Sequence, residues 1–394
     1  MQAQLSQRII NLAPSATVAA NDKAKKMKQQ GIDIINLTAG QPDFPTPDFI
    51  KEAGIKAIQQ NKTGYTPVDG VPELKQAIIQ KLQRDNQLDY SDHQIIVSAG
   101  VKQCLFNLTQ AILNPGDEAI SLAPYWVSYP AMAELAGATS VVIQANIDQA
   151  FKITPEQLEA AITPRTKLLF INSPSNPAGC LYNLEELRAL AAVLLQHPNI
   201  LIASDDIYEY INWSNTSFHN IVNACPALYD RTIVMNGVAK AHCMTGWRIG
   251  FAACHPDLMT AMKKIQSQST TCATSIAQYA AAAAFNANRN EFFTPMLEAY
   301  KERAQWLNSA LQQIEGVQCL NTTSTFYTFI EASQLIAQLG LKDDLALADF
   351  FLEKAHVATV PGTAFGSPNY LRLSFATSLD QIKQAIAQIK EAIH

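Results

Sequence analysis

Seven short runs of apolar and β-branched residues recur through the middle of the chain, and stretches with helical patterning separate them. The runs are QIIVS from Gln94, EAIS from Glu118, TSVVI from Thr139, KLLFIN from Lys167, NILIAS from Asn199, RTIVMN from Arg231 and RIGFAA from Arg248. Strands that alternate with helices are typical of a mostly parallel, doubly wound sheet. The chain is therefore expected to be an α/β protein, with its ligands beyond the carboxyl ends of these strands.

The length of 394 residues favours two domains, or one large domain with a smaller companion. We expect the large domain at residues 50–284, where the seven runs lie. Residues 1–49 and 285–394 are expected to form a second, smaller domain of mixed α and β structure. Helices are predicted at residues 22–30 and 290–313, whereas the strip LTAGQPDFPTP is too rich in Gly and Pro for regular structure.

The composition excludes several classes of protein. A net charge of −5 gives no basic field for nucleic acid. The cysteines are scattered and never form a C-x-x-C pair, which argues against a disulfide framework or a zinc site and favours a reducing compartment. The histidines show no HExxH spacing, and no run of eighteen apolar residues is present. We expect a soluble, cytoplasmic protein that binds no metal, membrane or nucleic acid.

The stretch NGVAKAHCMTGWRIG places Lys240 after one strand-like run and Arg248 at the start of the next. A deprotonated amine attacks an aldehyde, and a guanidinium makes paired, charge-assisted bonds to a phosphate. The alternative is that both are ordinary solvated charges. Gly100 and Val101 lie between a strand and a helix expected to begin near Lys102, and a helix N-terminus accommodates a phosphate. A plain turn between strand and helix is the alternative there.

Further candidates follow other strand-like runs. Trp126 in LAPYWVSYP is either a stacking platform or a core aromatic, and Asn176 in NSPSNPAG is either a ligand contact or a turn former. Asp205 in SDDIYEY is either a partner for a buried cation or a helix cap, and Tyr208 follows three residues later. Arg372 in YLRLSFA is either a carboxylate clamp or a paired surface charge.

Together these motifs resemble those of the class I aminotransferases of fold type I, which use pyridoxal 5′-phosphate. The resemblance covers nearly the whole chain and is strongest to the bacterial-type aspartate aminotransferases, which share PSATVA near the start and a TGWRIG string after the lysine. The positions that match in order and spacing are Gly40, Tyr65, Trp126, Asn176, Asp205, Tyr208, Lys240, Arg248 and Arg372.

The resemblance implies a role for each cofactor-binding position. Lys240 carries the cofactor and moves the substrate proton. Arg248 holds the cofactor phosphate, together with the amides of Gly100 and Val101. Trp126 stacks on the pyridine ring, while Asn176 and Tyr208 bond its ring oxygen. Asp205 keeps the ring nitrogen protonated, which makes the ring an electron sink. Tyr65 reaches the phosphate of a neighbouring subunit, so a homodimer with shared active sites is implied.

Substrate positions are implied in the same way. Arg372 clamps the α-carboxylate, which also meets Asn176 and the amide of Gly40, while Trp126 borders the substrate. Lys102 contributes to binding of the distal carboxylate, with Ser15 nearby. The activity expected from this set is ping-pong transfer of an amino group from L-aspartate to 2-oxoglutarate, which forms oxaloacetate and L-glutamate.

Several positions depart from the family pattern. Gly237 stands where many relatives carry a phosphate-binding serine, and His242 replaces a phenylalanine and is expected to be a packing residue. Ala13 stands where relatives that accept prephenate often carry lysine, which argues against prephenate. Three alternatives stay open: transamination of aromatic amino acids, alanine or prephenate; a pyridoxal-phosphate-dependent C–S β-lyase; and a regulator that binds the cofactor without turnover.

Overall fold

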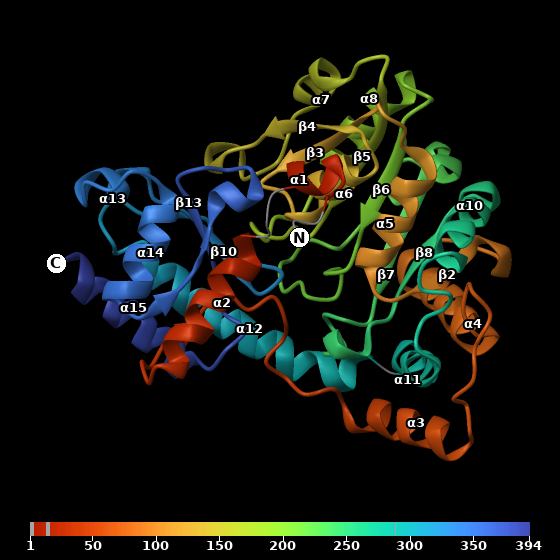
Figure 1. Cartoon of the computed structure of the whole chain (residues 1–394), viewed down its shortest axis with the longest axis horizontal. Coiled ribbons are helices and arrows are strands. Elements are labelled where there is room, and N and C mark those ends of the chain that lie inside the picture. The colour runs from red at the N-terminus through yellow and green to blue at the C-terminus, as the bar shows by residue number, and fades with distance from the viewer. Residues whose placement is uncertain (1–3, 13–15, 288) are drawn as a thin grey trace.

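The computed structural model describes residues 4–12, 16–287 and 289–394 (Figure 1). Its large sheet has seven strands. In spatial order they are β2 (Ile95–Ser98), β8 (Gly250–Ala253), β7 (Thr232–Gly237), β6 (Leu201–Asp205), β5 (Thr166–Asn172), β3 (Glu118–Ala123) and β4 (Thr139–Gln144). All neighbours pair in parallel except β8, which is antiparallel to both β2 and β7. The predicted runs therefore form the strands of one mostly parallel sheet.

Helices cover both faces of this sheet. One face packs against α5 (Val101–Ile112), α6 (Ser128–Leu135) and α10 (Pro256–Ser267). The other packs against α4 (Pro72–Lys81), α7 (Pro155–Ala161), α8 (Leu184–Gln196), α9 (Ile221–Ala224) and α11 (Ser275–Asn286). Successive residues of a strand point to opposite faces, so Ala203 enters one apolar core and Ile202 the other. Burial on both faces explains why the strands read as continuous apolar runs. The doubly wound α/β fold is confirmed.

The ends of the chain build a second group of strands. A four-stranded sheet runs in the order β12 (Val360–Pro361), β13 (Tyr370–Ser374), β10 (Tyr327–Glu331) and β9 (Gln318–Cys319). Beside it, β1 (Ile35–Asn36) pairs in parallel with β11 (Val357–Ala358). The backbone of Leu37 continues this link, because its carbonyl accepts a hydrogen bond of 2.8 Å from Ser374. The N-terminal strip thus joins the C-terminal segment, as expected, although the exact domain limits stay a prediction.

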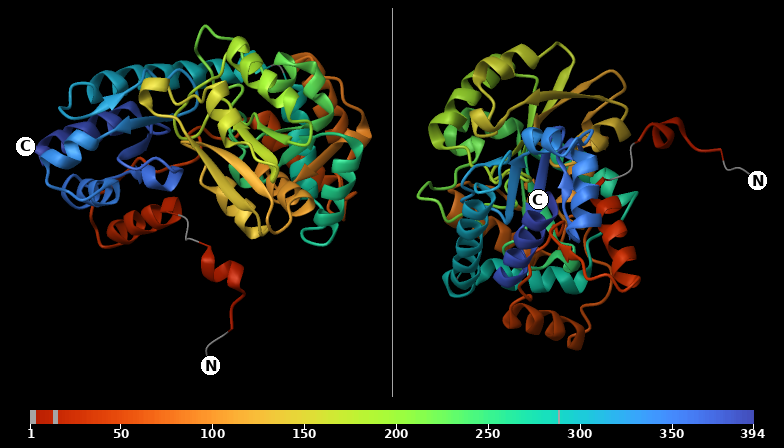
Figure 2. Two further views of the ribbon diagram at one scale, coloured as in Figure 1. Left: turned by 90° about the horizontal axis from the view of Figure 1, so that it is seen from above. Right: turned by 90° about the vertical axis from the view of Figure 1, so that its left-hand side faces the viewer.

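The helices around these strands are α2 (Ala16–Gln29), α12 (Arg289–Leu311), α13 (Ser333–Gln338), α14 (Asp344–Lys354) and α15 (Leu379–Ile393). The helix α3 (Asp48–Gln59) packs instead against α11, and α1 (Gln7–Asn11) contacts α6 (Figure 1). In Figure 2, α2 lies against the C-terminal part of the chain, where Lys23 forms an ion pair of 2.6 Å with Asp349 of α14. The helix predicted at residues 22–30 begins earlier, at Ala16, and the one predicted at residues 290–313 is α12. Within the described ranges, no helix combines the length and apolar character needed to cross a membrane.

Candidate active site

A cavity of about 810 Å³ opens at the carboxyl ends of the parallel strands. The register of the sheet brings polar residues together there, because Asn172 at the end of β5 lies opposite Asp205 at the end of β6. Most residues singled out from the sequence line this cavity: Gly40, Gly100, Val101, Lys102, Trp126, Asn176, Asp205, Tyr208, Lys240, Arg248 and Arg372. Segments from the N-terminal strip and from β13 therefore complete a site whose floor is the large sheet.

Lys240 follows β7 and places its amine inside the cavity. Its Nζ donates a hydrogen bond of 2.5 Å to the carbonyl oxygen of Gly40, and it lies 5.7 Å from the ring centre of Tyr208. Burial lowers the pKa of the Lys240 amine to about 8, and the positive charge of Arg372 adds to this effect. The nearby Asp205 carboxylate opposes it. A sizeable fraction of the amine is therefore neutral, and hence nucleophilic, near physiological pH.

Asp205 lies buried at the floor of the cavity. Its Oδ2 accepts a hydrogen bond of 2.8 Å from the hydroxyl of Tyr129, and the side chain of Asn172 donates to its backbone carbonyl over 2.7 Å. Burial raises the pKa of the Asp205 carboxyl to about 6, while Tyr129 pulls it back down. A carboxylate in this setting is stabilised by a cation placed beside it. The site thus has a place for a protonated nitrogen.

Tyr129 was missed by the sequence analysis. It is buried in α6, where its ring stacks on Phe170 with the centroids 4.8 Å apart. The available signal was its spacing of three residues from Trp126, since residues three apart at the start of a helix face the same side. The two rings do meet edge to face, at 5.4 Å.

One wall of the cavity is suited to an anion. The helix α5 begins at Val101, directly after Gly100, whose φ is +86°. A Cβ atom at Gly100 would lie 2.6 Å from the Nη2 atom of Arg248, so only glycine leaves room for the guanidinium. Arg248 itself donates hydrogen bonds to the carbonyls of Thr245 and Ala99, at 3.0 and 3.1 Å. The guanidinium therefore stays beside the positive end of the α5 dipole.

Two details near this wall correct or explain the sequence-based picture. Arg248 was expected to open a strand, but it has a φ of +57° and β8 begins only at Gly250. Gly237 is required by packing, because a Cβ atom there would lie 2.8 Å from the carbonyl oxygen of Ile249. A serine at this position would collide with the backbone of the neighbouring strand.

Arg372 comes from β13 and is only 2% exposed. Its Nη1 donates to Oδ1 of Asn176 over 3.1 Å, and its Nη2 donates to the carbonyl of Thr38 over 2.8 Å. The Nε–H has no hydrogen-bond partner among the described residues. Its guanidinium lies 4.4 Å from the ring centre of Tyr327, and burial lowers its pKa. A buried guanidinium with donors to spare is suited to a carboxylate ligand.

A second cation faces the cavity from α5. The Nζ atom of Lys102 lies 4.9 Å from the ring centre of Trp126, and burial together with Arg248 lowers its pKa. Asp22 and Lys25 of α2 also line the cavity, and the sequence analysis did not single them out. Those two are three residues apart and so lie on the same face of α2. In sequence, charged residues at this spacing look like an ordinary solvated helix surface.

Among the described residues, one predicted site residue lies outside this cavity. Tyr65 is 94% exposed and does not line it. Ser15 lies outside the described residues, as does Ala13. The packing role expected for His242 is confirmed, since it is buried against the rings of Phe285 and Phe293 and burial lowers its pKa to about 3. In the described part of the chain, no group of three or more His, Cys, Asp and Glu side chains is placed to hold a metal ion.

Comparison with known proteins agrees with this geometry. Residues 32–389 match the family model of aminotransferases of class I and II. The chain is 50% identical over 392 residues to the aspartate/prephenate aminotransferase of Nitrosomonas europaea, covering 98% of each chain.

Solved structures extend the likeness to the fold. The aspartate aminotransferase of Rhizobium meliloti has a TM-score of 0.96 and 40% identity, with coverage of 100% of this chain and 99% of that one. The aspartate aminotransferase of Thermus thermophilus with maleate has a TM-score of 0.93 and 40% identity, with coverage of 99% and 100%. The chain therefore belongs to the class I and II aminotransferases and works with pyridoxal 5′-phosphate.

Proposed function

We propose that this aminotransferase moves the amino group of L-aspartate to 2-oxoglutarate, forming oxaloacetate and L-glutamate. The observation that carries this proposal is one cavity that a reactive amine, Lys240, shares with two further cations, Arg372 and Lys102. Two cations suit a substrate with two carboxylates. The names of the relatives support aspartate, and the Thermus thermophilus neighbour was solved with maleate, which is also a dicarboxylate.

The donor groups of the cavity fit the cofactor. Lys240 would hold its aldehyde carbon, and Asp205 would pair with its ring nitrogen. Arg248 and the amides that begin α5 would hold its phosphate, in the space that Gly100 leaves beside the guanidinium. Trp126 would cover the ring, with Asn176 and Tyr208 at its oxygen. When bound, the cofactor withdraws electrons from the substrate and makes the proton on Cα acidic.

The protein groups then divide the work. Arg372 and Asn176 hold the α-carboxylate with the amide of Gly40, which fixes the Cα–H bond toward Lys240. The neutral amine of Lys240 takes the proton from Cα, and its lowered pKa suits it to this task. The first keto acid leaves before the second binds, so the kinetics are ping-pong. Positioned proton transfer of this kind is worth about 10²- to 10⁴-fold in rate.

Lys102 is proposed to select dicarboxylates. It lies over the ring of Trp126, which also lines the cavity, at the start of the helix that also contributes the phosphate-binding wall. Lys102→Ala is expected to raise KM for aspartate and glutamate about tenfold while leaving that for alanine nearly unchanged, because only the distal carboxylate loses its partner. Equal losses for alanine and aspartate would remove Lys102 from substrate selection.

A homodimer with shared sites is also proposed. Tyr65 projects into solvent from its own chain, so a contact between its hydroxyl and a cofactor phosphate requires a second subunit. Mixing inactive Lys240→Ala subunits with Tyr65→Ala subunits should restore activity, since a hybrid dimer keeps one intact site. Absence of recovery after confirmed subunit exchange would contradict the sharing. A cytoplasmic location is proposed with it, in keeping with seven free cysteines.

Prephenate is a second candidate acceptor. The Nitrosomonas europaea relative, at 50% identity, carries prephenate in its name. This weighs against the expectation drawn from Ala13. Steady-state assays with aspartate as donor and prephenate as acceptor decide the question, and no turnover there would restore the original expectation.

The decisive test is a half-reaction. The purified holoenzyme is mixed with single amino acids in the absence of any keto acid, and the cofactor absorbance is followed. Rapid conversion to the aminated cofactor by aspartate and glutamate alone supports the proposal. Conversion mainly by aromatic or small neutral amino acids, faster than by aspartate, would exclude aspartate specificity. Release of pyruvate and ammonia without an acceptor would instead indicate a β-lyase.

A further inference from the structure

The turn after β6 faces two different environments. Asp205 and Tyr208 line the cavity, whereas Asp206 and Glu209 are buried and absent from its lining. The turn is closed by a backbone hydrogen bond of 3.0 Å from Glu209 to the carbonyl of Asp206. Because the turn is so short, the position of Glu209 sets the position of Tyr208 beside it. Contacts that fix Asp206 and Glu209 therefore also fix Asp205 and Tyr208.

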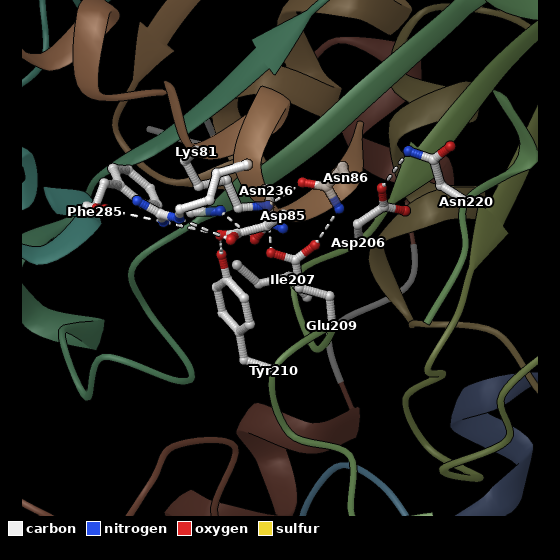
Figure 3. A network of polar contacts seen from close by, with 12 residues as sticks. Lys81, Asp85, Asn86, Asp206, Ile207, Glu209, Tyr210, Asn220, Asn236 and Phe285 are labelled. Carbon is white, nitrogen blue, oxygen red and sulfur yellow. Dashed lines mark hydrogen bonds and ion pairs between the residues drawn. The ribbon is translucent and has the colours of Figure 1, made fainter. Parts of the chain in front are cut away.

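A buried ion pair holds that side (Figure 3). The ammonium of Lys81, at the end of α4, pairs with the carboxylate of Glu209, and both side chains are almost wholly buried, at 1% and 3% exposed. Asn86 bridges the pair. Its Oδ1 accepts a hydrogen bond of 2.6 Å from Lys81, and its Nδ2 donates one of 2.8 Å to Oε2 of Glu209. The three side chains form a closed ring beneath the site.

The segment that supplies Asn86 is itself unusual. Helix α4 runs directly into a single turn of π-helix, Leu82–Asn86, which ends at Gln87 with a φ of +55°. Such turns are rare and are frequently found at functional sites. The backbone carbonyl of Asn86 accepts a hydrogen bond of 2.7 Å from the side chain of Asn223. The π-turn is thus anchored where it meets Glu209.

The same π-turn also holds Tyr210, the residue that follows Glu209. The hydroxyl of Tyr210 donates a hydrogen bond of 2.5 Å to Oδ2 of Asp85, and Arg84 pairs with that carboxylate at 2.8 Å. On the other side, Asp206 accepts a hydrogen bond of 2.7 Å from Ser204. Asp206, Glu209 and Tyr210 are therefore held by side chains that do not line the cavity.

We propose that Lys81 and Glu209 are positioning residues of the reaction: their buried ion pair, bridged by Asn86, fixes the turn that presents Asp205 and Tyr208 to the cofactor. This role rests on the proposed function, because it assumes the cofactor contacts of those two residues. Breaking a buried pair leaves an uncompensated charge, which shifts or loosens the turn. Asp205 and Tyr208 face the cofactor rather than the substrate carboxylates. Loosening them should lower cofactor affinity and kcat more than it raises KM.

The test compares Glu209→Gln with Glu118→Gln in the holoenzyme. Glu118 is a matched control, since its side chain is 6% exposed against 3% for that of Glu209. Glu118 lies at the start of β3, away from the carboxyl ends of the strands, and pairs with Arg165. Glu209→Gln should weaken cofactor binding about tenfold and lower kcat about tenfold, with KM for aspartate changed less than about threefold. Glu118→Gln should leave all three near the wild-type values.

Hydrogen exchange gives a readout that does not depend on activity. In the full-length chain without cofactor, the amides of Asp206, Glu209 and Ile211 are bonded to the carbonyls of Met235, Asp206 and Tyr208. Their exchange should be about tenfold faster in Glu209→Gln and unchanged in Glu118→Gln. Equal exchange and equal cofactor affinity in Glu209→Gln and the wild type would overturn the proposal, as would equal losses in both variants.

A double variant covers the case in which the single change does not fold. Lys81→Met with Glu209→Met removes both charges, and apolar replacement of a buried pair is commonly tolerated. We expect this variant to fold yet to bind the cofactor about tenfold more weakly, because the directional bonds to Asn86 are lost. Wild-type affinity would show that the pair only stabilises the fold. If the wild type fails to convert aspartate, the proposed substrate is wrong. Cofactor affinity and hydrogen exchange of the variants still decide the role of Lys81 and Glu209 in that case.

Discussion

The guanidinium of Arg372 donates a hydrogen bond to Oδ1 of Asn176 over 3.1 Å, and this bond ties β13 of the smaller sheet to the loop after β5 of the large one. Both groups are buried, at 2% and 6% exposed. The family resemblance assigned both residues to the same substrate carboxylate, and the structure places their side chains in direct contact. The Nε–H of Arg372, which has no hydrogen-bond partner among the described residues, adds a further donor on the same guanidinium.

Arg372→Ala is expected to lower kcat/KM about 10²- to 10³-fold for every amino acid, because charge-assisted bonds to the α-carboxylate contribute about 1.5–3 kcal/mol each. Arg372→Lys keeps the charge without the planar fork and should recover only part of the loss. Steady-state kinetics with aspartate, glutamate and alanine provide the check. A loss confined to the dicarboxylates would place Arg372 at the distal carboxylate instead.

Lys240→Ala should abolish turnover and covalent attachment of the cofactor. In the wild-type chain without cofactor, the rate of attachment should rise with pH and level off above about 8, because the amine becomes neutral as the pH passes its lowered pKa. Arg372→Ala should move this midpoint to higher pH, since the positive charge of Arg372 helps to lower the pKa of Lys240. Stopped-flow absorbance measures both midpoints. An unshifted midpoint would show that the two groups are not coupled.

Asp205→Asn should stabilise the cofactor-free chain at higher pH and lower the activity of the holoenzyme. In the chain without cofactor, burial raises the pKa of Asp205 from 3.8 to about 6, so the ionised carboxylate destabilises the native state. The stability linked to this group is fully present below pH 3.8 and is lost as the pH rises through about 6. The difference in the free energy of unfolding between Asp205→Asn and the wild type should therefore shift in favour of the variant from pH 4 to pH 8, by roughly 2–3 kcal/mol.

Chemical unfolding of both cofactor-free proteins at the two pH values measures this change. In the holoenzyme the same substitution should reduce kcat about 10²- to 10³-fold, because the carboxylate no longer supports the protonated ring nitrogen. A variant that loses activity without gaining relative stability at the higher pH would mean that Asp205 is not desolvated as the structure indicates.

Residues at or shortly after the carboxyl ends of strands were the predictable part of the site. Lys240, Asp205 and Asn176 each come after an apolar run, and the carboxyl ends of parallel strands meet at one edge of a sheet. The strands themselves were predictable because burial on both faces makes them continuous apolar runs.

Contacts made through long-range packing were not predictable in this way. Nothing in the local pattern shows that β1 pairs with β11, because register depends on tertiary contacts. Lys81 at the end of α4 reads as a solvated helix charge, and only its approach to Glu209 reveals a buried pair. Tyr129 belongs to the same class, since its partner Asp205 is supplied by a distant strand.

Tyr129→Phe isolates the hydrogen bond to Asp205. The phenyl ring keeps the stacking contact with Phe170, so the fold should change little. Loss of the hydroxyl removes a bond that lowers the pKa of Asp205, and that pKa should rise. The carboxylate then forms only at higher pH, and the acid limb of the pH profile for cofactor affinity should move upward.

Tyr182→Phe provides the control for this change. Tyr182 is equally buried, and its hydroxyl accepts a hydrogen bond of 2.9 Å from the backbone of Ile153, away from the cavity. Loss of either hydroxyl removes one buried hydrogen bond, worth about 1 kcal/mol of stability. Only Tyr129→Phe should move the acid limb, because only its hydroxyl contacts the residue that titrates. An identical profile for Tyr129→Phe and wild type would mean that the protonation of Asp205 is set by the cofactor alone.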